Sequence, residues 1–118
     1  MKLIMLGAHQ RSTSLAILER LTVSQERLPH ALHRLADYVP EGMIISTCNR
    51  VEIYALVNDA TQGLCALQEF LQDYQGISPH SLESALSRYS EEAVVRHLFR
   101  LAAGLDSMVL GDDQIDVL

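Results

Sequence analysis

Two strand-like segments separated by only four residues constrain the fold of this chain more than any other feature. Residues 51–57 are the clearest strand, because Glu52, Tyr54 and Leu56 alternate with Val51, Ile53, Ala55 and Val57. Residues 43–46 form a second, shorter apolar run. The connection is Thr47-Cys48-Asn49-Arg50, and so short a link, with asparagine as a favourable turn residue, predicts a tight hairpin.

Further strands and helices are predicted around this hairpin. Residues 2–6 form an apolar run that ends at Gly7 and is typical of a buried strand, and residues 84–89 form a weaker one. Helix starts are predicted at Ser12 or Thr13, at Ser24, at Thr61 and at Ser90. Helix ends are predicted at residues 40–42, at residues 76–79 and at Gly104. The apolar positions that recur at helical spacing are Leu15, Leu18 and Leu21; Leu28, Ala31, Leu32, Leu35 and Tyr38; Leu64, Leu67, Phe70, Leu71 and Tyr74; and Val94, Leu98, Leu101 and Leu105.

The order of these elements indicates the fold class. It is β-α-β-β-α-β with an additional C-terminal helix, which is the ferredoxin-like split βαβ arrangement of the α+β class. In such a fold we expect the helices to cover one face of a mainly antiparallel sheet. The length of 118 residues predicts one domain spanning residues 1–118.

Net charge and hydropathy exclude several classes of protein. Nine Lys and Arg stand against fifteen Asp and Glu, which gives a net charge of −6. A strong non-specific nucleic-acid binder would need a basic face, although this chain could touch the end of an RNA that is held elsewhere. The apolar runs are strand-length and the N-terminus lacks the long apolar stretch of a signal peptide, so we expect no membrane association and a cytoplasmic location.

The two cysteines have different surroundings. No C-x-x-C pattern is present, which removes the basis for a thioredoxin-like or zinc-ribbon site. Cys65 lies in the apolar pattern of the third helix, so we expect it to be buried, and a disulfide with Cys48 is disfavoured in a chain of intracellular composition.

Cys48 is the best candidate for chemistry because it lies in the hairpin turn. Arg50 follows two residues later, and a nearby cation stabilises a thiolate over a thiol. Thr47 and Asn49 add hydrogen-bond donors to the same turn. The combination suits a thiolate that attacks an activated carbonyl, with donors for the developing oxyanion. The alternative is a polar turn that happens to contain a cysteine.

Other polar residues give weaker signals. His97 lies beside the apolar stripe of the last helix, where a histidine serves either as a base or as a structural side chain. His30 and His33 have no third ligand nearby, so no metal site is predicted. The acidic run near the end, Asp106, Asp112, Asp113 and Asp116, is interpreted as a solvated segment. No glycine-rich nucleotide motif is present, so we expect this chain to bind no cofactor of its own.

Two segments together resemble a known family. Residues 46–54, Ser-Thr-Cys-Asn-Arg-Val-Glu-Ile-Tyr, are similar to the signature of glutamyl-tRNA reductases around their nucleophilic cysteine. Residues 97–111, His-Leu-Phe-Arg-Leu-Ala-Ala-Gly-Leu-Asp-Ser-Met-Val-Leu-Gly, resemble a second long motif of the same family, at its usual separation from the first. The resemblance covers essentially the whole chain, but only the N-terminal catalytic domain of the family.

The resemblance implies a reaction and a set of site residues. In this family a cysteine thiolate attacks the ester of glutamyl-tRNA, and NADPH reduces the thioester to glutamate-1-semialdehyde for tetrapyrrole (haem) synthesis. Cys48 matches the nucleophile, and His97 matches a histidine proposed to assist proton transfer. Arg50 matches the residue that holds the glutamyl group, since a guanidinium fits a carboxylate bidentately. The substrate pocket is matched by Thr47, Ser107 and Gln114.

The resemblance also implies partners. The full-length enzymes are NADPH-dependent oxidoreductases that bind the acceptor end of glutamyl-tRNA, form homodimers and are linked to glutamate-1-semialdehyde aminomutase. Their NADPH-binding and dimerisation domains are expected to be absent from this chain.

Departures from the family pattern keep other hypotheses open. Gln10 stands where the family has a histidine, and Ser14 where a helix usually begins near a proline. The family's Gly-Glu-x-Gln-Ile-Leu-Gly-Gln reads Gly-Asp-Asp-Gln-Ile-Asp-Val-Leu over residues 111–118. The Cys48 and Arg50 pair favours an acyl-transfer domain. The missing domains and the altered tail favour a non-catalytic relative that senses or carries haem through a Cys or His ligand. A plain structural or interaction domain is the third hypothesis.

Overall fold

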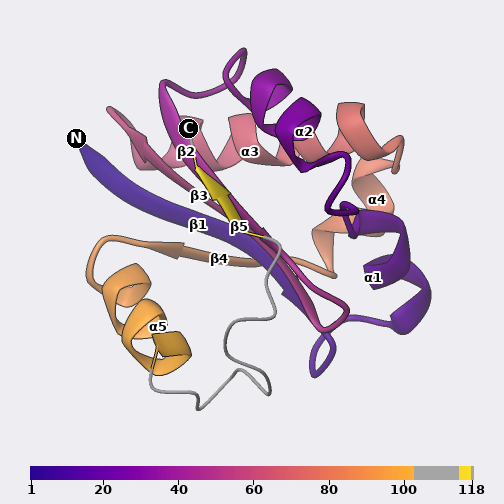
Figure 1. The fold of residues 1–118 in the computed structure, drawn as a ribbon. Coiled ribbons are helices and arrows are strands. Elements are labelled where there is room, and N and C mark those ends of the chain that lie inside the picture. The colour runs from indigo at the N-terminus through magenta and orange to yellow at the C-terminus, as the bar shows by residue number, and fades with distance from the viewer. Residues whose placement is uncertain (103–114, 118) are drawn as a thin grey trace.

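An antiparallel sheet runs through the centre of the molecule, in a computed structural model that describes residues 1–102 and 115–117 (Figure 1). Its strands are β1 (Lys2–His9), β2 (Glu41–Ser46), β3 (Arg50–Val57), β4 (Ser87–Ser90) and β5 (Ile115–Val117). Their order across the sheet is β4-β1-β3-β2-β5, and every neighbouring pair is antiparallel. The predicted α+β class and the predicted hairpin of β2 and β3 are confirmed.

Helices pack on both faces of this sheet, which corrects the expectation that they cover one face (Figure 1). The helices α1 (Leu15–Leu21), α2 (Leu28–Leu35), α3 (Ala60–Gln75) and α4 (Pro79–Glu83) contribute buried residues to one core. The last helix, α5 (Glu92–Ala102), packs on the opposite face, where Val94 joins Met5, Ile45 and Tyr54 in a second, smaller core.

The side-chain period of two in β3 explains why there are two cores. Val51, Ile53 and Ala55 point to the larger core, together with Ile4 and Leu6 of β1. The side chains between them point to the face that α5 covers, and Tyr54 is 3% exposed there. Both faces of the central strand are therefore buried, so a polar side chain on the α5 face must find partners within the protein.

The starts of α1 and α2 differ from the prediction because local hydrogen bonds select other caps. Ser14 is the N-cap of α1 and its Oγ accepts from the Ile17 N–H at 3.3 Å, whereas the Thr13 hydroxyl donates to the Ala85 carbonyl at 2.7 Å. Leu15 is 65% exposed rather than inward-facing. Residue 24 begins only a single turn, and α2 itself begins four residues later, next to a proline that suits the first helical turn.

The other element boundaries also shift by a few residues. Asp59 caps α3, not Thr61, and its side chain accepts from the Gln62 N–H at 2.8 Å. Gly76 ends α3 with φ +65°, as predicted from a residue type that tolerates this conformation. Strand β1 continues past Gly7, and residues 79–83, for which no element was predicted, form α4. Ser90 belongs to β4 and does not cap α5. Glu91, with φ 58°, changes the direction of the backbone between the strand and the helix.

The expectation that Cys65 is buried is wrong. Cys65 is exposed, because it lies on the outer side of α3 rather than under it. Residues 115–117 form the edge strand β5, with Asp116 opposite Ile44 of β2, whereas the other residues of the predicted acidic segment, Asp106, Asp112 and Asp113, lie outside the described residues. Gly104 and Leu105 lie outside the described residues, as does the side chain of Leu101.

We expect the close contact between α3 and the sheet to make Gly63 intolerant of larger residues. A Cβ at Gly63 would lie 2.7 Å from Val57 Cγ2 and 2.8 Å from Ile4 Cδ1. Gly63→Val should therefore lower the free energy of unfolding by about 1–3 kcal/mol, measured by urea denaturation. Gln62→Val, at the neighbouring exposed position, should cost only the helix propensity of valine, about 0.5 kcal/mol. Equal losses for the two variants would contradict this packing.

Candidate functional site

The β2–β3 hairpin presents Cys48 to solvent on a short, hydrogen-bonded loop. The Thr47 N–H donates to the Arg50 carbonyl at 2.8 Å and closes the loop. The Asn49 N–H donates to Thr47 Oγ1 at 3.1 Å, and the Asn49 carbonyl accepts from the Gln10 N–H at 3.0 Å. Cys48 is exposed and its thiol is not in a disulfide. The loop is therefore held from two sides, while the sulfur at its tip is accessible.

A buried carboxylate lies two residues beyond Arg50 on the same strand. Glu52 is 3% exposed, and its Oε2 accepts from His97 Nε2 at 2.6 Å. Its Oε1 accepts from the Tyr54 hydroxyl at 2.8 Å, and Arg50 Nη1 lies 3.5 Å from Oε2. Three donors from two elements thus converge on one carboxylate, which is the arrangement that allows a charge to be buried.

Strand geometry and helix geometry bring these groups together. Residues at i and i+2 of a strand share a face, so Arg50, Glu52 and Tyr54 all point toward α5. On α5, His97 lies three residues after the buried Val94, next to the face that packs on the sheet. His9 stands opposite Arg50 in the β1–β3 register, and its Nε2 lies 3.0 Å from Arg50 Nη2.

The electrostatics of the cluster keep Glu52 ionised. Burial raises the pKa of the Glu52 carboxyl, but the hydrogen bonds from His97 and Tyr54, with the charges of His97 and Arg50, outweigh it and leave the pKa below its ordinary 4.5. Burial raises the pKa of the Tyr54 hydroxyl, and the neighbouring charge of Glu52 raises it further. The carboxylate and the neutral phenol are therefore the resident forms across the physiological pH range.

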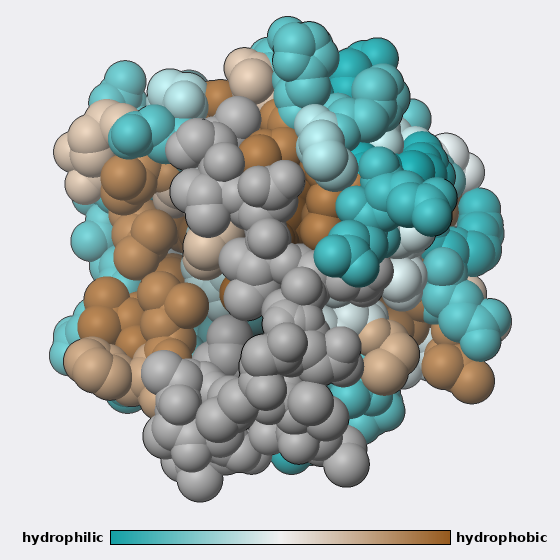
Figure 2. Space-filling view, in the orientation of Figure 1, coloured by the Kyte–Doolittle hydropathy of each residue, from teal (hydrophilic) through white to brown (hydrophobic). Residues whose placement is uncertain are grey.

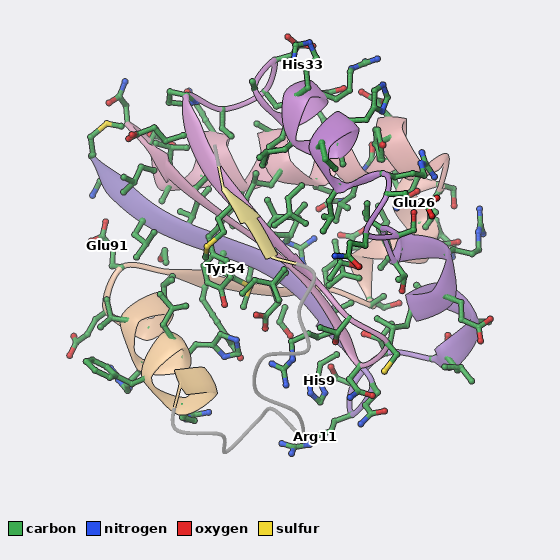
Figure 3. All side chains as sticks on the ribbon, viewed as in Figure 1. His9, Arg11, Glu26, His33, Tyr54 and Glu91 are labelled. Atoms are coloured by element: carbon green, nitrogen blue, oxygen red, sulfur yellow. The ribbon has the colours of Figure 1, made fainter. Side chains whose placement is uncertain are left out.

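A cavity of about 200 Å³ opens beside this cluster, on the side of the sheet that α5 covers. Its basic lining residues are Arg11, Arg50, Arg100, His9 and His97, and Glu52 is the one carboxylate among the described residues that line it. Figure 3 shows His9 and Arg11 close together at the end of β1, and Tyr54 between the sheet and α5. The cavity is suited to an anionic group, because guanidinium groups pair with carboxylates and phosphates.

The residues singled out from the sequence fall into three groups. Arg50 and His97 lie on the cavity and both contact Glu52. Thr47 and Cys48 lie in the adjoining hairpin loop and are not among the described lining residues. Ser107 and Gln114 lie outside the described residues. The roles of all six residues stay predictions.

Sequence reasoning missed the residue that connects Arg50 with His97. Glu52 was taken only as one side chain of an alternating strand. The available signal was an acidic residue in the middle of a strand that is apolar on both sides, at i+2 from an arginine. Within the described residues no three His, Cys, Asp or Glu side chains gather as they would around a metal ion.

Glu52→Gln should destabilise the protein in a pH-dependent way. Because the folded-state pKa of Glu52 is lowered, its ionised form contributes stability above pH 4.5, and that contribution is lost as the pH falls through the folded-state pKa. We expect the variant to lose roughly 1–3 kcal/mol of unfolding free energy at pH 7, with a smaller loss near pH 3.5. Urea denaturation at the two pH values measures this difference. Glu69→Gln, at an exposed position on α3, is the control and should show neither effect.

Comparison with known proteins identifies the family. The family model described as glutamyl-tRNAGlu reductase, N-terminal domain, matches residues 6–116. Curated glutamyl-tRNA reductases of Roseiflexus castenholzii and Salinispora arenicola are 51% and 46% identical over 115 and 117 residues. Each alignment covers 98% of this chain but only 27% and 26% of the relative, so the chain spans about a quarter of their length.

A solved structure gives the same result. The glutamyl-tRNA reductase from Methanopyrus kandleri superimposes with a TM-score of 0.58 at 26% sequence identity, over 90% of this chain and 23% of that one. The agreement extends from the sequence to the arrangement of strands and helices. This chain therefore belongs to the glutamyl-tRNA reductase family and corresponds to its N-terminal domain.

Proposed function

We propose that this chain is the acyl-transfer domain of a glutamyl-tRNA reductase and that it forms a cysteinyl thioester with the glutamyl group of glutamyl-tRNA. The product pathway would be tetrapyrrole synthesis, through reduction to glutamate-1-semialdehyde. One observation carries the proposal: an exposed cysteine lies two residues from an arginine that a buried carboxylate holds in place, in a chain of this family.

The proposed step needs a nucleophile, a leaving group and a proton balance. The Cys48 thiolate attacks the ester carbonyl, a carbon–sulfur bond forms, and the carbon–oxygen bond to the terminal ribose breaks. The ribose hydroxyl leaves and takes up a proton, for which His97 is the proposed donor or relay. The N–H groups of Thr47 and Asn49 already donate within the loop, so the Cys48 N–H and the Thr47 hydroxyl are the proposed donors to the oxyanion.

Arg50 is the proposed partner of the glutamyl side chain. Its side chain is 3% exposed, and its Nη1 and Nη2 already contact Glu52 and His9. A guanidinium offers five N–H donors, so these contacts orient the group without exhausting it. An arginine oriented in this way loses little side-chain entropy on binding a carboxylate. Thr47, Ser107 and Gln114 are proposed to complete the substrate pocket.

The described residues do not fit NADPH. A dinucleotide cradle needs a glycine-rich turn between a strand and the N-terminus of a helix. Here β1 leads into α1 through residues 10–14, Gln-Arg-Ser-Thr-Ser, and β3 leads into α3 through Asn58 and Asp59. No step of the proposed chemistry is therefore assigned to NADPH on this chain, and the reduction is proposed to take place with the remainder of a full-length enzyme.

The partners follow from the proposed reaction. The substrate is the acceptor end of glutamyl-tRNA, and the compartment is the cytoplasm, where charged tRNA is found. A second copy of the chain, in a homodimer, and glutamate-1-semialdehyde aminomutase are the proposed partners of a full-length enzyme.

No helix within residues 1–102 has the length and apolarity needed to cross a bilayer.

The two cysteines provide a matched test of the thiol step. Without the reduction step, glutamate is released when water hydrolyses the thioester on Cys48. Cys48→Ser cannot form this thioester, so the variant should release glutamate from glutamyl-tRNA only at the uncatalysed rate. Cys65→Ser changes the other exposed, free thiol and should release glutamate at the wild-type rate. Radiolabelled glutamate released from charged tRNA over time is the measurement. Equal rates for Cys48→Ser and the wild type would show that Cys48 is not a nucleophile in this chain.

Haem binding, the alternative hypothesis for this chain, stays a separate prediction. A porphyrin needs a large apolar slot, whereas the cavity beside Arg50 measures about 200 Å³ and has three arginines, two histidines and one glutamate among its described lining residues. We therefore expect no sharp Soret band on titration with haemin. A band that disappears in Cys48→Ser or in His97→Ala would favour the haem-binding module over the acyl-transfer domain.

A further inference from the structure

The imidazole of His97 is held by the buried carboxylate of Glu52 through one of its two ring nitrogens. His97 Nε2 lies 2.6 Å from Glu52 Oε2, and both side chains are largely buried. A contact of this length to an ionised group is a charge-assisted hydrogen bond, which is stronger than one between neutral groups. Because His97 belongs to α5 and Glu52 to β3, the orientation of the ring is set by a partner on another element.

The charge of Glu52 decides which atom carries the proton of this hydrogen bond. Burial raises the pKa of the Glu52 carboxyl, but the hydrogen bonds from His97 and Tyr54 and the charges around it leave the pKa below 4.5, so the group is ionised. An ionised carboxylate accepts hydrogen bonds and donates none. The proton therefore belongs to His97 Nε2, and Nδ1 is the ring nitrogen that remains for exchange of a proton.

The neighbours of the ring oppose the other orientation. Turning the imidazole over would place a C–H group where Nε2–H now meets Glu52 Oε2. That oxygen would then keep only the longer contact with Arg50 Nη1, at 3.5 Å, which is unfavourable for a buried charge. The ring of Tyr89 packs against the imidazole, with ring centroids 5.4 Å apart and the planes at 56°. His97 thus faces the cavity in one orientation and one tautomer.

We propose that Glu52 is a positioning residue for proton transfer: it holds the Nε2–H of His97, so that Nδ1 is the atom that gives a proton to the leaving ribose oxygen. This inference rests on the proposed function. When the carbon–oxygen bond breaks, its electron pair stays on the ribose oxygen, which takes the Nδ1 proton. The ring becomes neutral with its Nε2–H still on Glu52, and water returns a proton to Nδ1. A carboxylate that fixes the tautomer of a histidine serves general acid catalysis in this way.

Nitrogen NMR of histidine-labelled protein tests the tautomer without any substrate. Protonated and unprotonated ring nitrogens have well-separated chemical shifts, and they are read at a pH above which the His97 shifts no longer change. We expect the proton on Nε2 in the wild type. Glu52→Gln should show both tautomers, because its carboxamide can accept from Nε2–H or donate to Nε2. Tyr54→Phe, which removes the hydrogen bond to the other oxygen, Oε1, is the control and should keep the wild-type tautomer.

A wild-type ring that carries its proton on Nδ1 would overturn the assignment, and this outcome is decisive even if Glu52→Gln fails to fold. A single Nε2–H tautomer in a folded Glu52→Gln variant would also overturn it, because the carboxylate would then not be what sets the tautomer.

Two glutamyl esters with different leaving groups test the proton transfer. The probes are 2′(3′)-O-glutamyl-adenosine, whose ribose oxygen needs a proton in order to leave, and the 1-p-nitrophenyl ester of glutamate, whose phenolate leaves without one. The readout is kcat/KM for Cys48-dependent hydrolysis, which reports the acylation step. His97→Ala should lower this value for the adenosine ester, relative to the nitrophenyl ester, by about a hundredfold, and Glu52→Gln by about tenfold.

The ratio of the two rates isolates the effect on His97. Both esters carry the same glutamyl group, so weaker binding through Arg50, or partial unfolding, lowers the two rates equally and cancels. Glu69→Gln removes the same charge from an exposed position on α3 and should leave the ratio unchanged. A ratio that Glu52→Gln leaves unchanged, or that Glu69→Gln lowers equally, would overturn the positioning role.

The measurements also separate failure of this inference from failure of the proposed function. If Cys48→Ser hydrolyses both esters as fast as the wild type, the proposed function fails, and the NMR measurement still decides which nitrogen Glu52 holds. If Cys48→Ser is inactive while His97→Ala and Glu52→Gln keep the wild-type ratio, the thiol step stands and the assignment of the transferred proton to Nδ1 is wrong.

Discussion

The carboxylate of Glu52 is almost completely removed from water and is surrounded by donors from His97, Tyr54 and Arg50. A buried carboxylate without such partners would cost several kcal/mol, so the donors and the acceptor depend on each other. The cluster also joins two elements, because Glu52 belongs to β3 and His97 to α5. The arrangement of the candidate site and the docking of the last helix therefore rest on the same interaction.

The rest of the fold brings the cavity and the hairpin loop to one end of the sheet. The β1–β3 register sets His9 opposite Arg50, and the hydrogen bond beyond it joins the chain after β1 to the Cys48 loop. Gly7 leaves space for the buried carboxylate, since a Cβ there would lie 3.0 Å from Glu52 Cγ and 2.9 Å from the Val51 carbonyl oxygen.

The outer side of α5 is apolar. Figure 2 shows apolar surface over this helix, where Val95 and Phe99 are exposed.

Periodicity predicts the parts of this fold that repeat, and misses the parts that depend on single contacts. The alternation of residues 51–57 predicted β3 and its hairpin correctly, and the buried leucines of α2 follow the predicted stripe. The N-cap of α1 could not be predicted, because Ser12, Thr13 and Ser14 are all good caps, and the choice depends on the contacts of Thr13 with Ala85 and of Ser14 with Ile17. The docking of α5 on the second face could not be predicted either, because the apolar pattern of a helix does not indicate which face of the sheet the helix covers. At the site, the sequence indicated Arg50 and His97 separately, but the carboxylate between them is visible only once the strand and the helix are packed together.

The central claim is that the exposed thiol beside this cluster becomes covalently acylated. The most direct measurement is mass spectrometry of the protein after mixing with glutamyl-tRNA and rapid acid quenching, which preserves a thioester. The account predicts the added mass of one glutamyl group on the peptide that contains Cys48, with the peptide of Cys65 unmodified. Absence of the adduct while glutamate is being released, or an adduct on Cys65 instead, would contradict it.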